Sequence, residues 1–241
     1  ECDAEESRPS VVFAYTIKGW GLPMAGHPLN HSALMTPEQI DVLRGDLGLT
    51  IEDEWERFPA DSPEGQLCAA IGARINNSGV PPRPILPVPT SVAAPAVKGE
   101  ISTQQAFGRT LVRLARVDEI RDHIVTASPD VAISTNLGGW INKVGVFSHT
   151  EKNDSAGADQ LIKWISSPDG QHLELGISEM NLFLLLGQLG LSHDHHGQHL
   201  LPVGTVYDPF VLRGLDALIY SLYNDSRFVI AGTPSGGTLS P

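Results

Sequence analysis

The sequence predicts an α/β fold with a mainly parallel sheet flanked by helices. Beyond residue 100, short runs rich in β-branched residues alternate with longer runs of helical periodicity, a pattern typical of repeated strand-helix-strand units. Before that point, residues 79–99 hold six prolines and cannot form a regular helix or a central strand. Hydrophobic residues make up 41% of the 241-residue chain, enough for a substantial core. We therefore expect two folded parts joined by an extended linker.

The part before the linker, residues 1–78, is expected to be the end of an α/β domain. Residues 11–17, VVFAYTI, are β-branched and aromatic, and predict a short buried strand. A loop rich in glycine and proline follows. Two helices come next, each predicted by a hydroxyl residue at the cap and a proline at the first helical position: residues 37–48 after Thr36 and residues 63–77 after Ser62.

The part after the linker, residues 100–241, carries the helix and strand alternation. Ser102 resembles a helix cap, and a glycine-containing loop is expected at residues 136–145 before a polar stretch at residues 149–160. The predicted helices cover residues 103–116, the segment that begins near Ser178, and residues 209–224; the predicted strands cover residues 124–128, 172–177, 199–206 and 227–233.

Composition restricts the partners and the compartment. A net charge of −12 argues against nucleic acids and anionic membranes, because both reward clustered lysine and arginine. Cys2 and Cys68 are too few and too far apart for a disulfide framework, which favours a reducing, cytoplasmic compartment. No apolar run approaches the roughly 20 residues that cross a bilayer, and the acidic N-terminus is unlike an export signal. Because the chain lacks an initiating methionine and stops just after a predicted strand, we expect a fragment.

A single carboxylate, Glu179, opens the apolar run GISEMNLFLLLGQLG at residues 176–190, which predicts a buried helix. A buried carboxylate is costly unless it is paired, hydrogen-bonded or protonated. In an α/β domain this position follows a strand, at the edge of the sheet where ligands bind. Taken alone, the local sequence favours a simpler interpretation, in which the acid stabilises the helix N-terminus by a few tenths to about 1 kcal/mol.

Several segments together resemble one enzyme family. ISTQQAFGRTLVRLAR, ASPDV, LGISEMN and VYDPFVLRGLDAL are similar to the pyrimidine-binding domain of thiamine-diphosphate enzymes of the transketolase superfamily. Upstream, FAYTIKGWG and a loop ending in NHSALM resemble the end of the diphosphate-binding domain. Order and spacing are most similar to the homodimeric, decarboxylating first component of bacterial pyruvate dehydrogenase. The resemblance implies that residues 1–78 end the diphosphate-binding domain and that residues 100–241 form the pyrimidine-binding domain, truncated at its C-terminus.

The resemblance implies catalytic roles for two residues. In this family, a glutamate that opens a helix after a strand contacts a ring nitrogen of the cofactor's aminopyrimidine, and GISEMN places Glu179 at that position. Its carboxyl group would exchange a proton with the ring and so activate the cofactor, which requires a poorly solvated pocket. His31, within AGHPLNHSALM, matches a histidine on a mobile loop and would transfer a proton or orient the acceptor. His27 is a weaker candidate.

Three further residues are implied at the cofactor. Tyr207 and Phe210, in VYDPFVLRG, match positions where aromatic side chains lie against the pyrimidine ring. Aromatic contact orients a flat heterocycle and excludes water, although core packing is an alternative interpretation. Asp130, in SPDV, corresponds to an acidic position near the active site.

No metal ligands are expected in this chain. The family holds the cofactor's diphosphate through Mg²⁺, bound by a Gly-Asp-Gly motif and a later asparagine, and Gly45-Asp46-Leu47 departs from this motif at its third position. The segment SHDHHGQH, residues 192–199, contains several histidines, but their spacing fits no defined zinc motif. We expect a polar loop there, near the cofactor cleft, and Mg²⁺ ligands outside this segment.

The expected function is thiamine-diphosphate-dependent oxidative decarboxylation of a 2-keto acid, with pyruvate as the implied substrate and a lipoyl group as the acyl acceptor. The expected partners are the keto acid, a second copy in a homodimer, and a lipoyl-bearing acyltransferase subunit. Two alternatives stay open. One is transketolase-type ketol transfer between sugar phosphates, which calls for several basic residues at the substrate. The other is a non-catalytic remnant or interaction module that lacks the metal-binding half.

Overall fold

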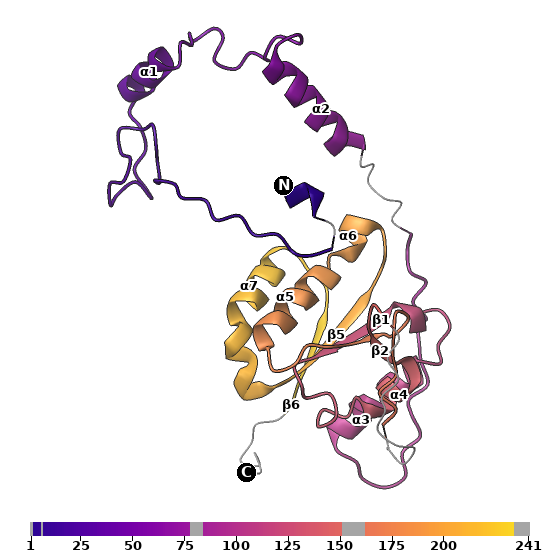
Figure 1. The fold of residues 1–241 in the computed structure, drawn as a ribbon. Helices are drawn as coiled ribbons and strands as arrows, with labels where there is room; N and C mark the ends of the chain where they lie inside the picture. The colour runs from indigo at the N-terminus through magenta and orange to yellow at the C-terminus, as the bar shows by residue number, and fades with distance from the viewer. Residues whose placement is uncertain (1, 6, 78–83, 151–161, 234–241) are drawn as a thin grey trace. The chain divides into compact units, whose positions relative to one another are not determined.

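The structure, a computed structural model, describes residues 2–5, 7–77, 84–150 and 162–233 (Figure 1). The chain divides into two compact units, Glu1–Asn77 and Ser78–Pro241. No helix in the described ranges is long and apolar enough to span a lipid bilayer.

The first unit contains the two predicted helices, α1 (Pro37–Asp46) and α2 (Pro63–Asn77), together with a short 3-10 helix, η1 (Cys2–Ala4). Thr36 caps α1: its hydroxyl accepts a hydrogen bond from the Gln39 N–H, and the Gln39 side chain accepts one from the Thr36 N–H. At the start of α2, the Ser62 hydroxyl accepts a hydrogen bond from the Gly65 N–H at 3.0 Å. Both predicted helix starts are confirmed.

The predicted strand at residues 11–17 is wrong, because these residues form no strand. The whole segment is exposed, and Phe13 and Tyr15 are 84% and 100% exposed. A strand persists only where its N–H and C=O groups pair with those of a neighbour. Within the described part of the chain, no segment pairs with these residues. An apolar, β-branched pattern therefore did not suffice to predict a buried strand.

The second unit is built on a six-stranded sheet whose strand pairs are all parallel, which confirms the predicted fold class. The strand order is β3-β2-β4-β1-β5-β6, so β1 lies inside the sheet between β4 and β5. Thr126 of β1 is in register with His172 of β4 and Val203 of β5. The strands are β1 (Ile124–Ser128), β2 (Val146–Phe147), β3 (Ser166–Ser167), β4 (His172–Glu174), β5 (Leu201–Tyr207) and β6 (Val229–Thr233).

Helices cover the sheet in two pairs, α3 with α4 and α5 with α7 (Figure 1). The apolar core accordingly forms two clusters, one around Leu111 and Trp140 and the other around Leu186 and Val206. Burial on both faces is what a parallel sheet requires. The helical elements are α3 (Thr103–Leu114), η2 (Arg121–His123), α4 (Gly138–Val144), α5 (Glu179–Leu189), α6 (Ser192–His196), η3 (Asp208–Gly214) and α7 (Leu215–Tyr223).

Most of the predicted elements of the second unit are confirmed. Ser102 caps α3 through a capping box with Gln105. The predicted helix at residues 209–224 begins with a 3-10 segment before it continues as α7. Residues 84–99 of the predicted linker contain no helix or strand. The polar stretch expected at residues 149–160 lies mostly outside the described residues.

Two predicted loops are wrong because they contain helices. Residues 136–145 include α4, in which Trp140 and Ile141 are almost completely buried. Burial of these large side chains outweighs the low helix propensity of the two glycines at the start of α4. The segment at residues 192–199 includes the short helix α6, which ends at Gly197 in a left-handed conformation.

Candidate active site

Glu179 is the first residue of α5, just beyond the carboxyl end of β4, and only 6% of its surface is exposed. The residue before it, Ser178, forms no side-chain cap on the helix. The carboxylate therefore occupies the first turn of an apolar helix, where the N–H groups and the helix dipole favour a negative charge. The predicted burial of this acid is found in the structure.

Arg213, from η3, is the residue that pairs with Glu179. Its Nη1 atom donates a hydrogen bond to Oε1 of Glu179 at 3.2 Å. The second carboxylate oxygen, Oε2, has no hydrogen-bond partner among the described residues. A buried acid with one oxygen fixed by a cation and the other unused by the protein can accept or donate a hydrogen bond to a ligand.

Phe210 and Tyr207 lie next to this ion pair. The guanidinium carbon of Arg213 is 3.7 Å from the centroid of the Phe210 ring, a cation–π contact that orients the arginine. The rings of Tyr207 and Phe210 are 6.0 Å apart, with their planes at 56°. The Tyr207 hydroxyl donates a hydrogen bond to Oγ of Ser134 at 2.5 Å. The structure thus links Phe210 to Glu179 through Arg213, and both aromatic rings are only partly buried.

Close packing fixes η3 against α5. A Cβ atom at Gly214 would lie 2.2 Å from Cδ2 of Phe183 and 2.8 Å from the carbonyl oxygen of Glu179. No side chain therefore fits at this position without movement of the backbone that carries Glu179. Arg213 immediately precedes this glycine, so the backbone of Arg213 is held close to the start of α5.

Asp130 lies beyond the carboxyl end of β1 and is exposed. Its backbone adopts a φ of +63°, which is uncommon for a residue with a side chain. The Asp130 N–H donates a hydrogen bond to Oε1 of Glu174 at 2.7 Å, which holds this turn against the end of β4. Among the described residues, no hydrogen bond or ion pair joins the Asp130 side chain to Glu179, so its role in the site stays a prediction.

A chain of polar groups supports Glu174 from inside the sheet. Nε1 of Trp140 donates to Oγ1 of Thr126 at 2.9 Å, and that hydroxyl lies 2.8 Å from Nδ1 of His172. Nε2 of His172 is 3.5 Å from Oε2 of Glu174. All of these contacts are satisfied when the Thr126 hydroxyl donates to Nδ1 and the neutral imidazole carries its proton on Nε2, directed toward the carboxylate.

His31 lies in the first unit, on an exposed loop. Its Nδ1 atom is 3.0 Å from Nζ of Lys18, and the neighbouring His27 accepts a hydrogen bond from the Leu29 N–H at 3.1 Å. The remaining predicted site residues belong to the second unit, and the role of His31 stays a prediction.

The histidine-rich segment lies just before the amino end of β5, where two of its imidazole rings pack together. In the described ranges, no group of three or more histidine, cysteine, aspartate or glutamate side chains is arranged to hold a metal ion. The rings of His193 and His199 are 4.8 Å apart, and Nδ1 of His199 is buried without a hydrogen-bond partner. Burial, together with the charges of His193, His123 and Arg227, lowers the pKa of His199.

Residues 90–240 match the family described as the pyruvate dehydrogenase E1 component middle domain. The chain belongs to this family. That assignment covers the sheet, the ion pair between Glu179 and Arg213, and both aromatic residues beside it. It confirms the resemblance inferred from the sequence, to the pyruvate dehydrogenase branch of the transketolase superfamily.

Curated relatives support the pyruvate dehydrogenase E1 assignment. The chain is 28% identical to the pyruvate dehydrogenase E1 component of Cupriavidus necator over 98% of its own length, and 27% identical to that of Pseudomonas aeruginosa over the same share. It spans 29% of the length of each of these relatives. The E1 component of Corynebacterium glutamicum is 26% identical over 97% of this chain and 28% of its own.

A solved structure supports the transketolase-like fold of this E1 middle domain. Transketolase from Campylobacter jejuni superposes with a TM-score of 0.50 over 82% of this chain and 29% of its own, at 15% sequence identity. At this identity the similarity concerns the fold.

Neither Arg213 nor the chain of polar groups that supports Glu174 was predicted from the sequence. Arg213 stands in VYDPFVLRG, the same segment as both predicted aromatic residues, and the need of a buried acid for a cation could have identified it. His172 and Glu174 lie two apart on a strand and so share one face of the sheet, which is also a visible signal.

Proposed function

We propose that this chain forms part of a thiamine-diphosphate-dependent enzyme that oxidatively decarboxylates a 2-keto acid and transfers the acyl unit to a lipoyl group. The observation that carries the proposal is the state of Glu179, which is buried just beyond the end of β4 with Oε1 held by Arg213 and with no hydrogen bond to Oε2 from the described residues. Membership of the pyruvate dehydrogenase E1 middle-domain family and the named relatives support pyruvate as the substrate.

The residues around Glu179 fit the aminopyrimidine half of thiamine diphosphate. An unused oxygen on a poorly solvated acid provides a hydrogen-bond partner for a ring nitrogen. The aromatic side chains of Phe210 and Tyr207, partly exposed beside it, provide apolar area for a flat ring. When bound, thiamine diphosphate would supply a nucleophilic carbon for the keto group and a thiazolium that takes up the electron pair left behind as carbon dioxide departs.

The protein's own residues would position the pyrimidine ring of the cofactor and exchange a proton with it. Glu179 would hold or release a proton at Oε2, facing the pyrimidine nitrogen, while Arg213 keeps the carboxylate from rotating away. Phe210, held against Arg213, would exclude water from the same region. His31, on the first unit, would donate a proton to substrate or orient the acyl acceptor.

The proposal extends to the quaternary structure, the metal ion and the partner subunit. We infer a homodimer in which the diphosphate-binding domain of one subunit meets the pyrimidine-binding domain of the other, with the domains bounded as residues 1–78 and 100–241. Mg²⁺ would bind the diphosphate through ligands outside this segment. A lipoyl-bearing acyltransferase subunit would receive the product, and the protein would be cytoplasmic.

Transketolase-type transfer is less well supported by the local charges. A sugar phosphate at Glu179 would need basic side chains free to meet the phosphate. Among the described residues, Arg213 is the arginine within ion-pair distance of Glu179, and it already contacts both that carboxylate and Phe210. Three other arginines do converge on one cavity, but Glu179, Tyr207 and Phe210 do not line it.

The experiment is carbon dioxide release from a panel of 2-keto acids by the full natural gene product, supplied with thiamine diphosphate and Mg²⁺. We expect turnover of pyruvate, and a loss of at least about 100-fold in Glu179→Gln, because one group that transfers protons contributes 10²- to 10⁴-fold. Asp216→Asn is the matched control, since Asp216 is an exposed acid in the first turn of α7. Turnover of sugar phosphates instead would favour the transketolase alternative, and no turnover with intact folding would favour the non-catalytic one.

A further inference from the structure

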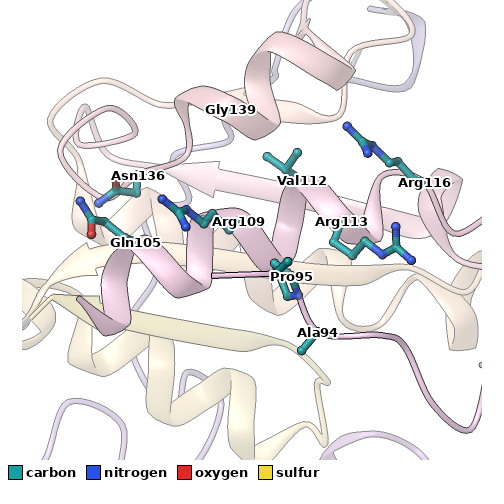
Figure 2. Close-up of a pocket in the computed structure, with 11 residues that line it drawn as sticks. Ala94, Pro95, Gln105, Arg109, Val112, Arg113, Arg116, Asn136 and Gly139 are labelled. Atoms are coloured by element: carbon teal, nitrogen blue, oxygen red, sulfur yellow. The ribbon is translucent and has the colours of Figure 1, made fainter. Parts of the chain in front are cut away.

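Three arginines from one face of α3 and its end line a single cavity of about 680 Å³ (Figure 2). Arg109, Arg113 and Arg116 are spaced four and three residues apart, so they project from the same side of the helix. The extended segment before the helix lines the cavity with Ala94, Pro95 and Ala96. Asn136, just before α4, and Gly139, within α4, also line it. The volume lies within the range of small-molecule sites.

Among the described residues, no carboxylate offsets the positive charge in this cavity. None of the residues that line it is acidic. In the part of the chain that the structure describes, neither Arg109 nor Arg113 nor Arg116 lies within ion-pair distance of a carboxylate. By contrast Arg121, a few residues further on, contacts both Asp118 and Asp122. Uncompensated cations one helical turn apart repel one another, in a chain whose net charge is −12.

The helix dipole explains only part of this arrangement. Cations near a helix C-terminus are favoured by a few tenths to about 1 kcal/mol, which suits Arg113 in the last turn of α3. Arg109 lies in the middle of α3, where the dipole gives it no advantage. All three arginines are exposed and solvated, and together they leave the cavity with a net positive charge that suits an anionic ligand.

The cavity also has a polar end formed by neutral amides. Gln105 and Asn136 lie together there, beside Arg109 (Figure 2). At this end, α3 packs closely against the residues just before α4. A Cβ atom at Gly108 would lie 2.3 Å from the carbonyl oxygen of Asn136. This packing fixes Asn136, whose φ is +63°, against α3. The site thus offers a row of three cations followed by donors and acceptors without charge.

We propose that this cavity binds a small anion with two or three linked phosphates, either free or as the tail of a nucleotide. Guanidinium groups bind phosphate oxygens in paired hydrogen bonds, which suits arginine better than lysine. Arg109 and Arg113 lie about 6 Å apart along the axis of α3, and Arg116 follows just beyond the end of the helix, so a linear polyphosphate can meet all three in turn. The amides of Gln105 and Asn136 would then contact the group attached to the chain of phosphates.

The test is calorimetric titration of the full gene product with inorganic tripolyphosphate, ADP and ATP, at low salt and again at 0.3 M salt. We expect saturable tripolyphosphate binding below about 1 mM that weakens with salt. Each of Arg109→Gln, Arg113→Gln and Arg116→Gln should weaken binding at least about tenfold, as the loss of a charge-assisted hydrogen bond does. Tighter binding of the nucleotides than of tripolyphosphate would assign the uncharged end of the cavity to the nucleoside.

Arg121→Gln is the matched control, because it removes the same charge from an arginine that is already paired. It should change the affinity less than about twofold. Circular dichroism and thermal unfolding establish that each variant folds, and Arg116, beyond the last turn of α3, gives a variant with little effect on the helix. The proposal is overturned if tripolyphosphate does not saturate the folded protein, if the three variants bind like Arg121→Gln, or if polyglutamate binds and tripolyphosphate does not.

Discussion

Arg213 and Glu179 form an ion pair of unequal exposure: the Glu179 side chain is 7% exposed, whereas the Arg213 side chain is 53% exposed. The carboxylate has given up most of its contact with water, and its main compensation is a cation that still reaches solvent. The two residues come from different elements, α5 and η3, which meet at Gly214. The site consequently depends on this one contact between elements that are far apart in the sequence.

Removal of the cation should destabilise the fold. In Arg213→Met the carboxylate stays buried without its partner, and we expect a loss of about 1–2 kcal/mol in the free energy of unfolding, limited by the exposure of the arginine. Urea unfolding measures the change. A double-mutant cycle with Glu179→Gln should show that Arg213→Met costs much less when the charge is already gone. Equal costs in both backgrounds would show that the pair is not coupled.

Substitution of Gly214 should disturb the same contact by steric overlap. Gly214→Ala places a methyl group against Phe183 and the Glu179 backbone, and should cost about 1–3 kcal/mol. Gly72→Ala in α2 is the control, because a Cβ atom there would meet nothing within 4 Å and alanine favours helix. Thermal unfolding of both variants tests this. A Gly214→Ala protein as stable as the wild type would mean that η3 can shift freely.

The buried hydroxyl of Thr126 should contribute strongly to the free energy of unfolding, because two buried polar groups bond to it. Thr126→Val keeps the shape of the side chain but leaves the Trp140 indole N–H and Nδ1 of His172 without partners. Two unpaired groups inside the sheet should cost about 2–4 kcal/mol. Thr110→Val, on an exposed position of α3, should cost under about 0.5 kcal/mol. Denaturant midpoints compare the two, and similar values would contradict the proposed polar chain.

The histidine cluster should make stability depend on pH. The pKa of His199 is lowered, first by burial and then by nearby positive groups, so the unfolded chain takes up a proton more readily. Stability should therefore be complete above the ordinary value of 6.5, fall as the pH drops through it, and level off below the folded pKa. His199→Gln should flatten this dependence, whereas His196→Gln, at an exposed position, should not. Melting temperatures from pH 8 to pH 5 decide between these outcomes.

The sequence predicted the parallel sheet well because its strands are short apolar runs flanked by caps and helices. The cap residues Thr36 and Ser102 were found because capping depends on neighbours only three residues away. The strand at residues 11–17 was predicted wrongly because pairing is not local: the same apolar residues are buried or exposed according to whether a second strand lies beside them. Two short strands, β2 and β3, were missed because two residues carry no periodic signal.

The candidate site was predicted in part for the same reason. Glu179 could be singled out because a carboxylate at the start of an apolar helix is unusual, but its site role was implied only by the resemblance of GISEMN to the enzyme family. Its partner Arg213 was not predicted, because the contact between residues 213 and 179 is not local; only the general need of a buried acid for a cation pointed to it. The cavity lined by Arg109, Arg113 and Arg116 was likewise not predicted. Their spacing is visible in the sequence, but the cavity forms only because residues 94–96 lie opposite them in the fold.

The most direct measurement of the central claim is the rate of proton exchange at the thiazolium carbon of thiamine diphosphate, followed by NMR after quenching the full gene product in deuterated buffer. This rate reports activation of the cofactor without dependence on substrate or acceptor. The account predicts that Glu179→Gln slows exchange at least about 100-fold, while Asp216→Asn leaves it unchanged. Exchange in Glu179→Gln within about twofold of the wild type, with the cofactor bound, would contradict the role of this carboxylate.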